Sequence, residues 1–246
     1  MKTTIAHITD PHTDETFTTG SQVDARADLK SLLEEVHAAG ITEVVIGGDI
    51  GDPSSHLFTF DLLNRYGGNY RLVLGNHDHF KEILPHYNPL PAGRTEFYYA
   101  EGKGPYKHIY LDSSSENISE EQLEWFKNEM QTHKKIILFI HHPILPVNAE
   151  VDRAFPLKGR EKIAEVLQQH PEEIYIFCGH LHLDDEQTQG NIRQYVTMAV
   201  SLQFVRTSDV LAFDRSSFGY RIITISDAGI ETTNIVKQRP DADTSI

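Results

Sequence analysis

Residues 4–12 have the sequence TIAHITDPH, a strand-forming run that leads directly into Asp10 and His12. Its β-branched and apolar residues predict a first β-strand over residues 4–9. Side chains two positions apart project to the same side of extended chain, so Asp10 and His12 can approach one ion together. A surface Asp-X-His sequence is common, so this cluster gains meaning only from the rest of the chain.

The remaining chain repeats the same order, an apolar strand followed by polar residues. Predicted strands cover residues 43–46, 70–74, 97–100, 108–112, 135–140, 174–178, 191–200, 220–226 and 230–236. Helical periodicity over 24–39, 57–66 and 158–170, and a capping box that opens at Ser119, predict helices between them. This alternation indicates an α/β protein, in which ligand sites collect at the carboxyl ends of strands.

Four further polar clusters follow predicted strands: Gly47-Gly48-Asp49, Gly75-Asn76-His77-Asp78, His141-His142 and Gly179-His180-Leu181-His182. Asp49 has two carboxylate oxygens and can bridge two cations, and amide and imidazole groups also bind divalent ions. Asp78 can fix the tautomer of its neighbour His77 and raise the His77 pKa. Each cluster alone has an ordinary explanation as a turn, a cap or a core histidine. Together the five clusters supply ligands for two metal ions, without a cysteine.

Composition limits the classes of partner. We expect residues 1–236 to form one domain and residues 237–246 a polar C-terminal tail. The net charge of −14 argues against a nucleic-acid polymer as ligand. No apolar run reaches the roughly 18 residues that a membrane helix needs, and the first ten residues lack an apolar signal core. The single cysteine, Cys178, fits a reducing compartment, so we expect a cytoplasmic protein without a membrane partner.

The histidine content is high, with 14 residues, and position decides their meaning. His142 is left open between a packing role and support of a ligand. His7 is expected to be structural, and His79, His86, His108 and His170 are expected at the surface or beside the ligands rather than among them.

In their order along the chain, the five clusters resemble the calcineurin-like metallophosphoesterase superfamily, over residues 10–182. The resemblance implies an α/β fold of four layers, α/β/β/α, in which two facing β-sheets are flanked by helices. It also implies two divalent or mixed-valence ions (Mn, Fe or Zn). One ion would be held by Asp10, His12, Asp49 and His182, and the other by Asp49, Asn76, His141 and His180. His77, supported by Asp78, would contact the phosphate and stabilise or protonate the leaving oxygen.

Within that superfamily, the segments HITDPH, GNHDHF, IHHP and CGHLH are most similar to class III cyclic nucleotide phosphodiesterases and glycerophosphodiesterases. GGDIGDPSS and LGNHDHF lack the arginines of the protein Ser/Thr phosphatases, and Ile144 stands where a second proline is frequent. The resemblance implies in-line hydrolysis of a small phosphodiester by ion-activated hydroxide, in a homodimer. A phosphomonoesterase of broad specificity is the alternative. A non-catalytic scaffold ranks last, because scaffold relatives typically lose metal ligands.

Overall fold

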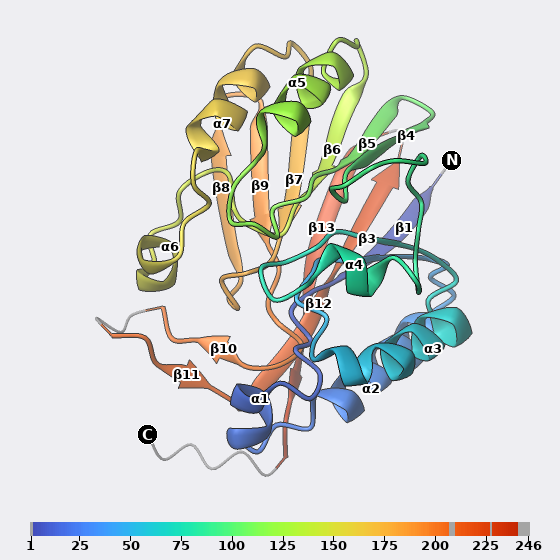
Figure 1. Ribbon diagram of the computed structural model, residues 1–246, viewed down its shortest axis with the longest axis vertical. Coiled ribbons are helices and arrows are strands. Elements are labelled where there is room, and N and C mark those ends of the chain that lie inside the picture. Colours follow the sequence, from blue (N-terminus) through green and yellow to red (C-terminus); the bar gives the residue numbers. More distant parts are fainter. Residues whose placement is uncertain (1, 207–209, 227, 241–246) are drawn as a thin grey trace.

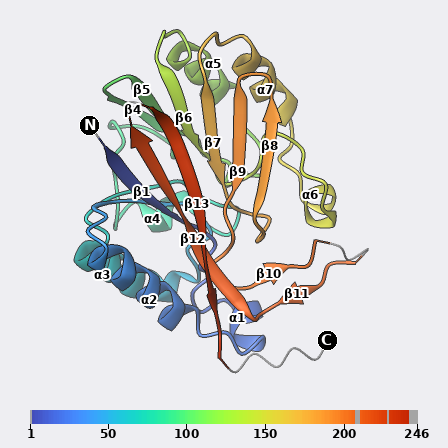
Figure 2. The same ribbon diagram turned by 180° about the vertical axis from the view of Figure 1, so that it is seen from behind.

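The computed structural model describes residues 2–206, 210–226 and 228–240. Two β-sheets face each other and helices cover their outer sides, as Figures 1 and 2 show from opposite directions. The predicted four-layer α/β/β/α sandwich is therefore confirmed. None of the helices in the described ranges is long and apolar enough to cross a membrane.

The first sheet has the strand order β13-β12-β1-β2-β3. Its strands are β1 (Thr3–Ile8), β2 (Glu43–Ile46), β3 (Asn69–Leu72), β12 (Ser217–Ser226) and β13 (Gly229–Gln238). β1, β2 and β3 are parallel, whereas β12 pairs antiparallel with β1 and with β13. Helices α2 (Ala25–Ala38) and α3 (His56–Tyr66) cover this sheet. The predicted apolar stripe of α2 is fully buried, which fixes the face that the helix turns to the sheet.

The second sheet has the order β4-β5-β6-β7-β9-β8. Its strands are β4 (Tyr99–Lys103), β5 (Tyr106–Tyr110), β6 (Lys135–Phe139), β7 (Ile174–Cys178), β8 (Asp185–Gln189) and β9 (Ile192–Val196). The four strands β5, β6, β7 and β9 are parallel, so their carboxyl ends lie at one edge. Helices α5 (Glu120–Glu129) and α7 (Arg160–Gln168) cover the outer face.

A layer of aromatic rings runs across the second sheet on the side that faces the first. The ring centroids of Tyr99 and Tyr110 are 4.4 Å apart, and those of Tyr110 and Phe139 are 5.3 Å apart. Phe177 continues the row 5.6 Å from Phe139, and Tyr195 lies 5.3 Å beyond Phe177. Most strand residues at the alternate positions, such as Ile109, Leu138 and Ile176, are aliphatic and pack in the cluster under α5 and α7. This period of two gives both faces of the sheet a dry interface.

Several short elements were not predicted: α1 (Thr16–Gly20), η1 (Pro53–Ser55), α4 (Phe80–Ile83), α6 (Glu150–Ala154), β10 (Gln203–Phe204) and β11 (Phe213–Asp214). They are too short to show a hydrophobic period. β8 was missed because its sequence, DEQTQ, has no apolar alternation. In Figure 1, α1, α6 and the β10–β11 pair border the same side of the molecule.

The predicted polar tail begins too early. β13 continues through Gln238, where it pairs with Ser217 at the start of β12. The guanidinium of Arg239 then donates to the Asp28 carboxylate at 2.7 Å and to the Val200 carbonyl at 2.9 Å. These contacts hold the chain end against α2, so residues 237–239 belong to the folded domain rather than to a separate tail. Residues 241–246, the rest of the predicted tail, lie outside the described residues.

His108 was expected at the surface or beside the ligands, but it lies inside the sandwich on β5. Its side chain is 1% exposed, and neither ring nitrogen has a hydrogen-bond partner. Burial, together with the nearby charges of Lys103 and Arg71, lowers the pKa of His108 to about 3. An imidazole without hydrogen-bond partners in an apolar interior destabilises the fold. The cost grows at low pH, because the imidazole takes up a proton in the unfolded chain but not in the folded protein.

We expect the free energy of unfolding to fall as the pH is lowered from about 7.5 to 5. We expect His108→Leu to reduce that fall. The unfolded chain protonates His108 near pH 6.5, whereas the folded protein does so only near pH 3. The contribution of neutral His108 is therefore complete above pH 6.5 and is lost as the pH falls toward 3. At pH 5 this loss is about 2 kcal/mol. Urea unfolding of the variant and of the exposed control His133→Leu measures it, and equal pH dependence in both would contradict the assignment.

Candidate metal centre

The ends of β1 and β2 stay paired after the strands stop. The Asp10 amide donates to the Gly48 carbonyl at 3.1 Å, and the His12 amide donates to the Asp49 carbonyl at 2.9 Å. The two loops therefore run side by side, and they place the carboxylates of Asp10 and Asp49 next to each other. Both side chains are almost completely buried.

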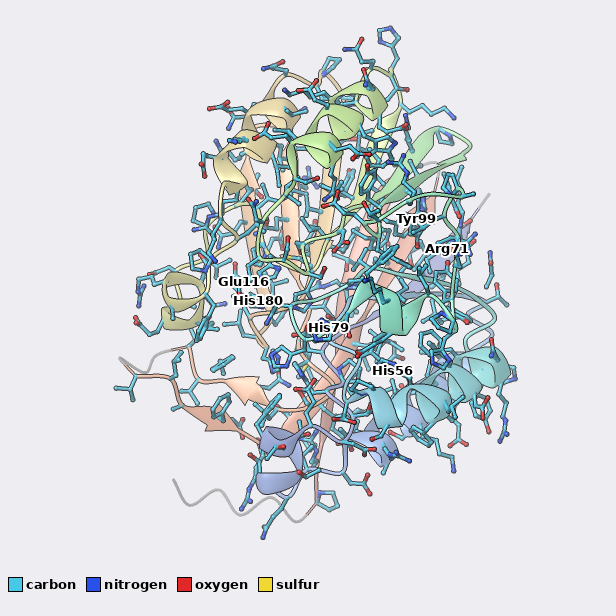
Figure 3. All side chains as sticks on the ribbon, viewed as in Figure 1. His56, Arg71, His79, Tyr99, Glu116 and His180 are labelled. Atoms are coloured by element: carbon cyan, nitrogen blue, oxygen red, sulfur yellow. The ribbon has the colours of Figure 1, made fainter. Side chains whose placement is uncertain are left out.

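The second sheet contributes the histidines. His141 follows β6, and His180 and His182 follow β7. The two sheets join here: the His180 amide donates to the Asp10 carboxylate at 3.0 Å, and the Ser201 amide donates to the Asp10 carbonyl at 3.2 Å. His180 lies in the region of Figure 3 where the second sheet ends, beside Glu116. The predicted residues from distant parts of the sequence thus meet at one place.

Two glycines permit this close approach. A Cβ atom on Gly75 would lie 2.1 Å from an Asp49 carboxylate oxygen. On Gly179 it would lie 2.1 Å from the Thr9 hydroxyl and 2.3 Å from an Asp10 oxygen. Any larger residue would push the carboxylates out of position, so glycine is required at both positions.

The backbone is strained at the predicted ligands. Five of them are non-glycine residues with positive φ: Asp10 (53°), His12 (44°), Asp49 (52°), His180 (66°) and His182 (45°). Such conformations cost roughly 1–3 kcal/mol each, and they persist where the surrounding structure imposes them. Backbone strain concentrated at residues with polar, metal-binding side chains indicates a functional site rather than ordinary turns.

Three imidazoles have the same orientation, with Nδ1 turned away from the carboxylates and fixed by an acceptor. The pairs are His12 with Glu15 (3.0 Å), His141 with the Gly47 carbonyl (2.7 Å) and His182 with the Leu202 carbonyl (2.8 Å). Carbonyl and carboxylate oxygens only accept, so Nδ1 carries the proton in each ring. The neutral form of each ring therefore has its lone pair on Nε2, as metal-binding histidines do.

The Nε2 atoms converge on the two carboxylates. His182 Nε2 lies 3.2 Å from Asp10 Oδ1, and His141 Nε2 lies 3.2 Å from Asp49 Oδ2. His12 Nε2 is 3.4 Å from Asp49 Oδ2 and only 3.1 Å from His182 Nε2. Two lone pairs that face each other at this distance repel, unless a cation lies between them. The arrangement therefore fits a metal ion.

The electrostatics lead to the same conclusion. Burial would raise the pKa of both Asp10 and Asp49, but His141 and other imidazoles more than offset it and hold both below their ordinary values. For His141, burial acts to lower the pKa, yet the two carboxylates raise it to about 10. Buried carboxylates side by side need compensating positive charge. Divalent cations supply it more fully than one imidazolium.

Unsatisfied polar atoms also mark the site. Asn76 Oδ1 and His141 Nε2 are buried without a hydrogen-bond partner. Asn76 lines the same cavity as Asp49, His12 and His182. The residues present thus fit a pair of ions with oxygen and imidazole ligands, a donor set that Mn, Fe and Zn all accept.

His180 differs from the other three histidines. Its Nε2 contacts the Phe155 carbonyl at 2.9 Å, so it does not offer this atom to the carboxylates. Burial, followed by the charge of His141, lowers the His180 pKa to about 4. His142, whose role the sequence left open, packs against His180 with ring centroids 4.0 Å apart and ring planes tilted by 38°. The ring nitrogens of His141, His142 and His180 lie close enough to bind one ion, so His142 joins the candidate ligands.

Asp78 does not contact His77, and the prediction that it orients this histidine is wrong. Its carboxylate accepts from three backbone amides, those of Gly75 (2.9 Å), Asp49 (2.8 Å) and Ile50 (2.9 Å). The turn points the Asp78 side chain inward and the His77 side chain outward. Asp78 therefore fixes the loops that carry Asn76 and Asp49, and it acts through them rather than as a catalytic group.

The partner of His77 is Glu15, which the sequence analysis missed. Glu15 Oε2 lies 2.7 Å from His77 Nδ1, while Oε1 lies 3.0 Å from His12 Nδ1. The Glu15 hydrogen bond raises the pKa of His77 to about 9. Burial alone would raise the Glu15 pKa, but the two histidines lower it to about 2. Only the acidic residue three positions after His12 could have suggested this role, and acidic residues in loops are common.

We expect Glu15→Gln to weaken metal binding by roughly 10- to 100-fold, the usual effect of losing a carboxylate behind a ligating histidine. An amide can present NH₂ to His12 Nδ1 and favour the wrong tautomer. Metal titration followed by calorimetry measures the affinity. Glu173→Gln, which removes a surface partner of Lys135, is the matched control. Equal affinities in the two variants would show that Glu15 does not support the site.

Comparison with known proteins agrees with this geometry. A family model described as calcineurin-like phosphoesterase matches residues 3–184. The 3′,5′-cyclic adenosine monophosphate phosphodiesterase CpdA of Vibrio vulnificus is 30% identical over 169 residues, which are 65% of this chain and 61% of that protein. The CpdA of Haemophilus influenzae is 22% identical over 93% of this chain and 88% of its own length.

A solved structure shares the fold. A dimetal phosphatase from Danio rerio superposes with a TM-score of 0.64 at 16% identity, over 95% of this chain and 98% of that one. The family match covers the five polar clusters, and the structure gathers them into a buried group of aspartates and histidines. The chain therefore belongs to the calcineurin-like phosphoesterase family.

Proposed function

We propose that this protein hydrolyses a small phosphodiester, either a cyclic nucleotide or a glycerophosphodiester, at two metal ions. The observation that carries the proposal is the pair of buried carboxylates, Asp10 and Asp49, faced by the Nε2 atoms of three histidines. Two ions held there would activate water for in-line attack and offset charge on the phosphoryl oxygens. The water oxygen bonds to phosphorus, the bond to the leaving alcohol breaks, and the leaving oxygen receives a proton.

The charge of the cavity supports a diester over a monoester. Among the described residues that line it, Lys158 is the only lysine or arginine. Its ammonium lies 2.8 Å from the Glu116 carboxylate, so its charge is already paired. A monoester carries up to two negative charges and gains from additional cations, whereas a diester carries one. The resemblance to proteins named as cyclic nucleotide phosphodiesterases supports the same choice.

His77 is placed to serve the leaving group. Its side chain is 41% exposed and lines the cavity next to Asn76. Glu15 holds Nδ1, which fixes the ring plane and leaves Nε2 for the substrate. In the proposed reaction, Nε2–H donates to the oxygen that leaves phosphorus.

A panel of substrates tests the proposal. The metal-reconstituted protein should hydrolyse bis-p-nitrophenyl phosphate, and either cyclic AMP or a glycerophosphodiester, faster than p-nitrophenyl phosphate. A preference for the monoester would assign a phosphomonoesterase instead. Absence of turnover with all four, in protein shown to contain two ions, would assign a non-catalytic scaffold.

We expect His77→Ala to keep both ions and to lower turnover by roughly 100- to 10,000-fold, the range for a lost general acid. The loss should be largest for a ribose or glycerol leaving oxygen and smaller for p-nitrophenolate, which departs without a proton. Metal analysis and turnover of both substrate types measure this. His79→Ala, an exposed histidine two positions along, is the control (Figure 3). A parallel drop in metal content would make His77 a ligand.

The cytoplasmic location and the homodimer remain predictions from the sequence. Light scattering at working concentration tests the homodimer directly.

A further inference from the structure

The cavity over the metal centre has two unlike halves. Its volume is about 490 Å³. One half is formed by the predicted ligands and His77, and the other by apolar side chains from α1, α6 and the β10–β11 pair. The charged half accounts for a phosphoryl group. It leaves the apolar half without an assigned role.

Apolar side chains in this second half are unusually exposed. Phe155 is 50% exposed, Leu211 is 41% exposed and Phe213 is 52% exposed. Large apolar residues that stay in water at the mouth of a concave site commonly mark where a ligand is covered. They lie on short elements next to the centre, not on the helices that close the sandwich. The wall is therefore available to a substrate that reaches outward from the phosphate position.

The wall is aromatic and connects directly to the metal centre. The ring of Phe204 lies 5.5 Å from that of His182, a predicted ligand, and 4.6 Å from that of Phe213. These three rings form a continuous row from the phosphate position to the outer strand. A flat, weakly polar group attached to the phosphate can pack along this row. Stacking of a base on aromatic side chains is sequence-tolerant, because each base has a π-face.

The same wall is poorly suited to a glycerol group. Glycerol hydroxyls need hydrogen-bond partners when water is removed from them. The apolar residues offer none from their side chains, and the Lys158 and Glu116 groups on the rim are already paired with each other. A nucleoside can place the flat face of its base against the wall, whereas a glycerol group there would lose hydration without compensation.

We propose that Phe155, Phe204 and Phe213, with Leu211, form a subsite for the nucleobase of a nucleoside phosphodiester. This inference rests on the proposed function and deepens it, because it selects a cyclic nucleotide over a glycerophosphodiester. The phosphate lies at the metal centre, and the base packs against β10, β11 and the end of α6.

Binding of two reaction products separates the subsite from the chemistry. Adenosine 5′-monophosphate and glycerol 3-phosphate share a phosphate monoester and differ in the group that the wall would contact. Calorimetry on the holoprotein should show tighter binding of the adenosine compound. Phe213→Ala should weaken that binding by roughly tenfold, the size of a lost stacking contact. The affinity for glycerol 3-phosphate should change by less than about twofold. Phe213→Tyr, which keeps the ring, should retain wild-type affinity.

A matched pair of leucine variants controls for loss of apolar surface. Leu211→Ala should weaken the binding of adenosine 5′-monophosphate. Leu57→Ala, an equally large change at a 70% exposed position on α3, should leave that binding unchanged. Equal binding of the two products, or equal effects of the two leucine variants, would overturn the subsite. If Phe213→Ala instead altered the oligomeric state and left both affinities unchanged, the wall would be a contact between copies of the chain.

Turnover distinguishes failure of this inference from failure of the proposed function. If the wild-type protein hydrolyses diesters but Phe213→Ala leaves KM for cyclic AMP unchanged, the function stands and the subsite is wrong. If the wild-type protein hydrolyses no diester, the proposed function is wrong. The expected result is a higher KM for cyclic AMP with little change in the rate for a glycerophosphodiester.

Discussion

The burial of two carboxylates side by side is the constraint on which the rest of this structure depends. Asp10 and Asp49 lie at the ends of neighbouring parallel strands, and solvent reaches neither to a useful extent. The cost of removing one ionised group from water is several kcal/mol, and like charges add to it. Positive charge must therefore be present at the same point. The converging imidazole nitrogens show where it belongs.

The sandwich makes this constraint tolerable. Two sheets with dry faces on both sides hold the strand ends firmly, so the five ligand residues with positive φ can keep their strained conformations. Asp78 contributes by binding three amides of the turns that carry Asn76 and Asp49. Glu15 ties His12 to His77 through one carboxylate. The proposed chemistry thus depends on residues that do not contact the phosphate. Loss of the Asp78 or the Glu15 carboxylate would displace side chains of the metal centre.

The alternation of predicted strands and helices indicated the α/β class, and the order of the polar clusters carried the family resemblance that implied the four layers. An apolar strand that ends in Asp or His needs no tertiary information to be recognised. The prediction that Asp78 orients His77 was wrong because the side chains of these two neighbours in the turn point in opposite directions. Glu15 was missed because its contact with His77 exists only after the loops that follow β1 and β3 come together, while its local contact with His12 has no distinctive sequence pattern. The short elements α6, β10 and β11 have no period to detect.

The metal centre and the apolar wall lie on different kinds of structural element. The metal centre stands on strand ends, where a change of one residue disturbs charge, strain and packing together. The apolar wall stands on α6 and a short strand pair that contribute little to the core of the sandwich. A substrate group of different shape could therefore be accommodated by changing Phe155 or Phe213, without disturbing the buried carboxylates. The separation also explains why the predicted ligands were readable in the sequence, whereas the group that they act upon had to be inferred from the wall.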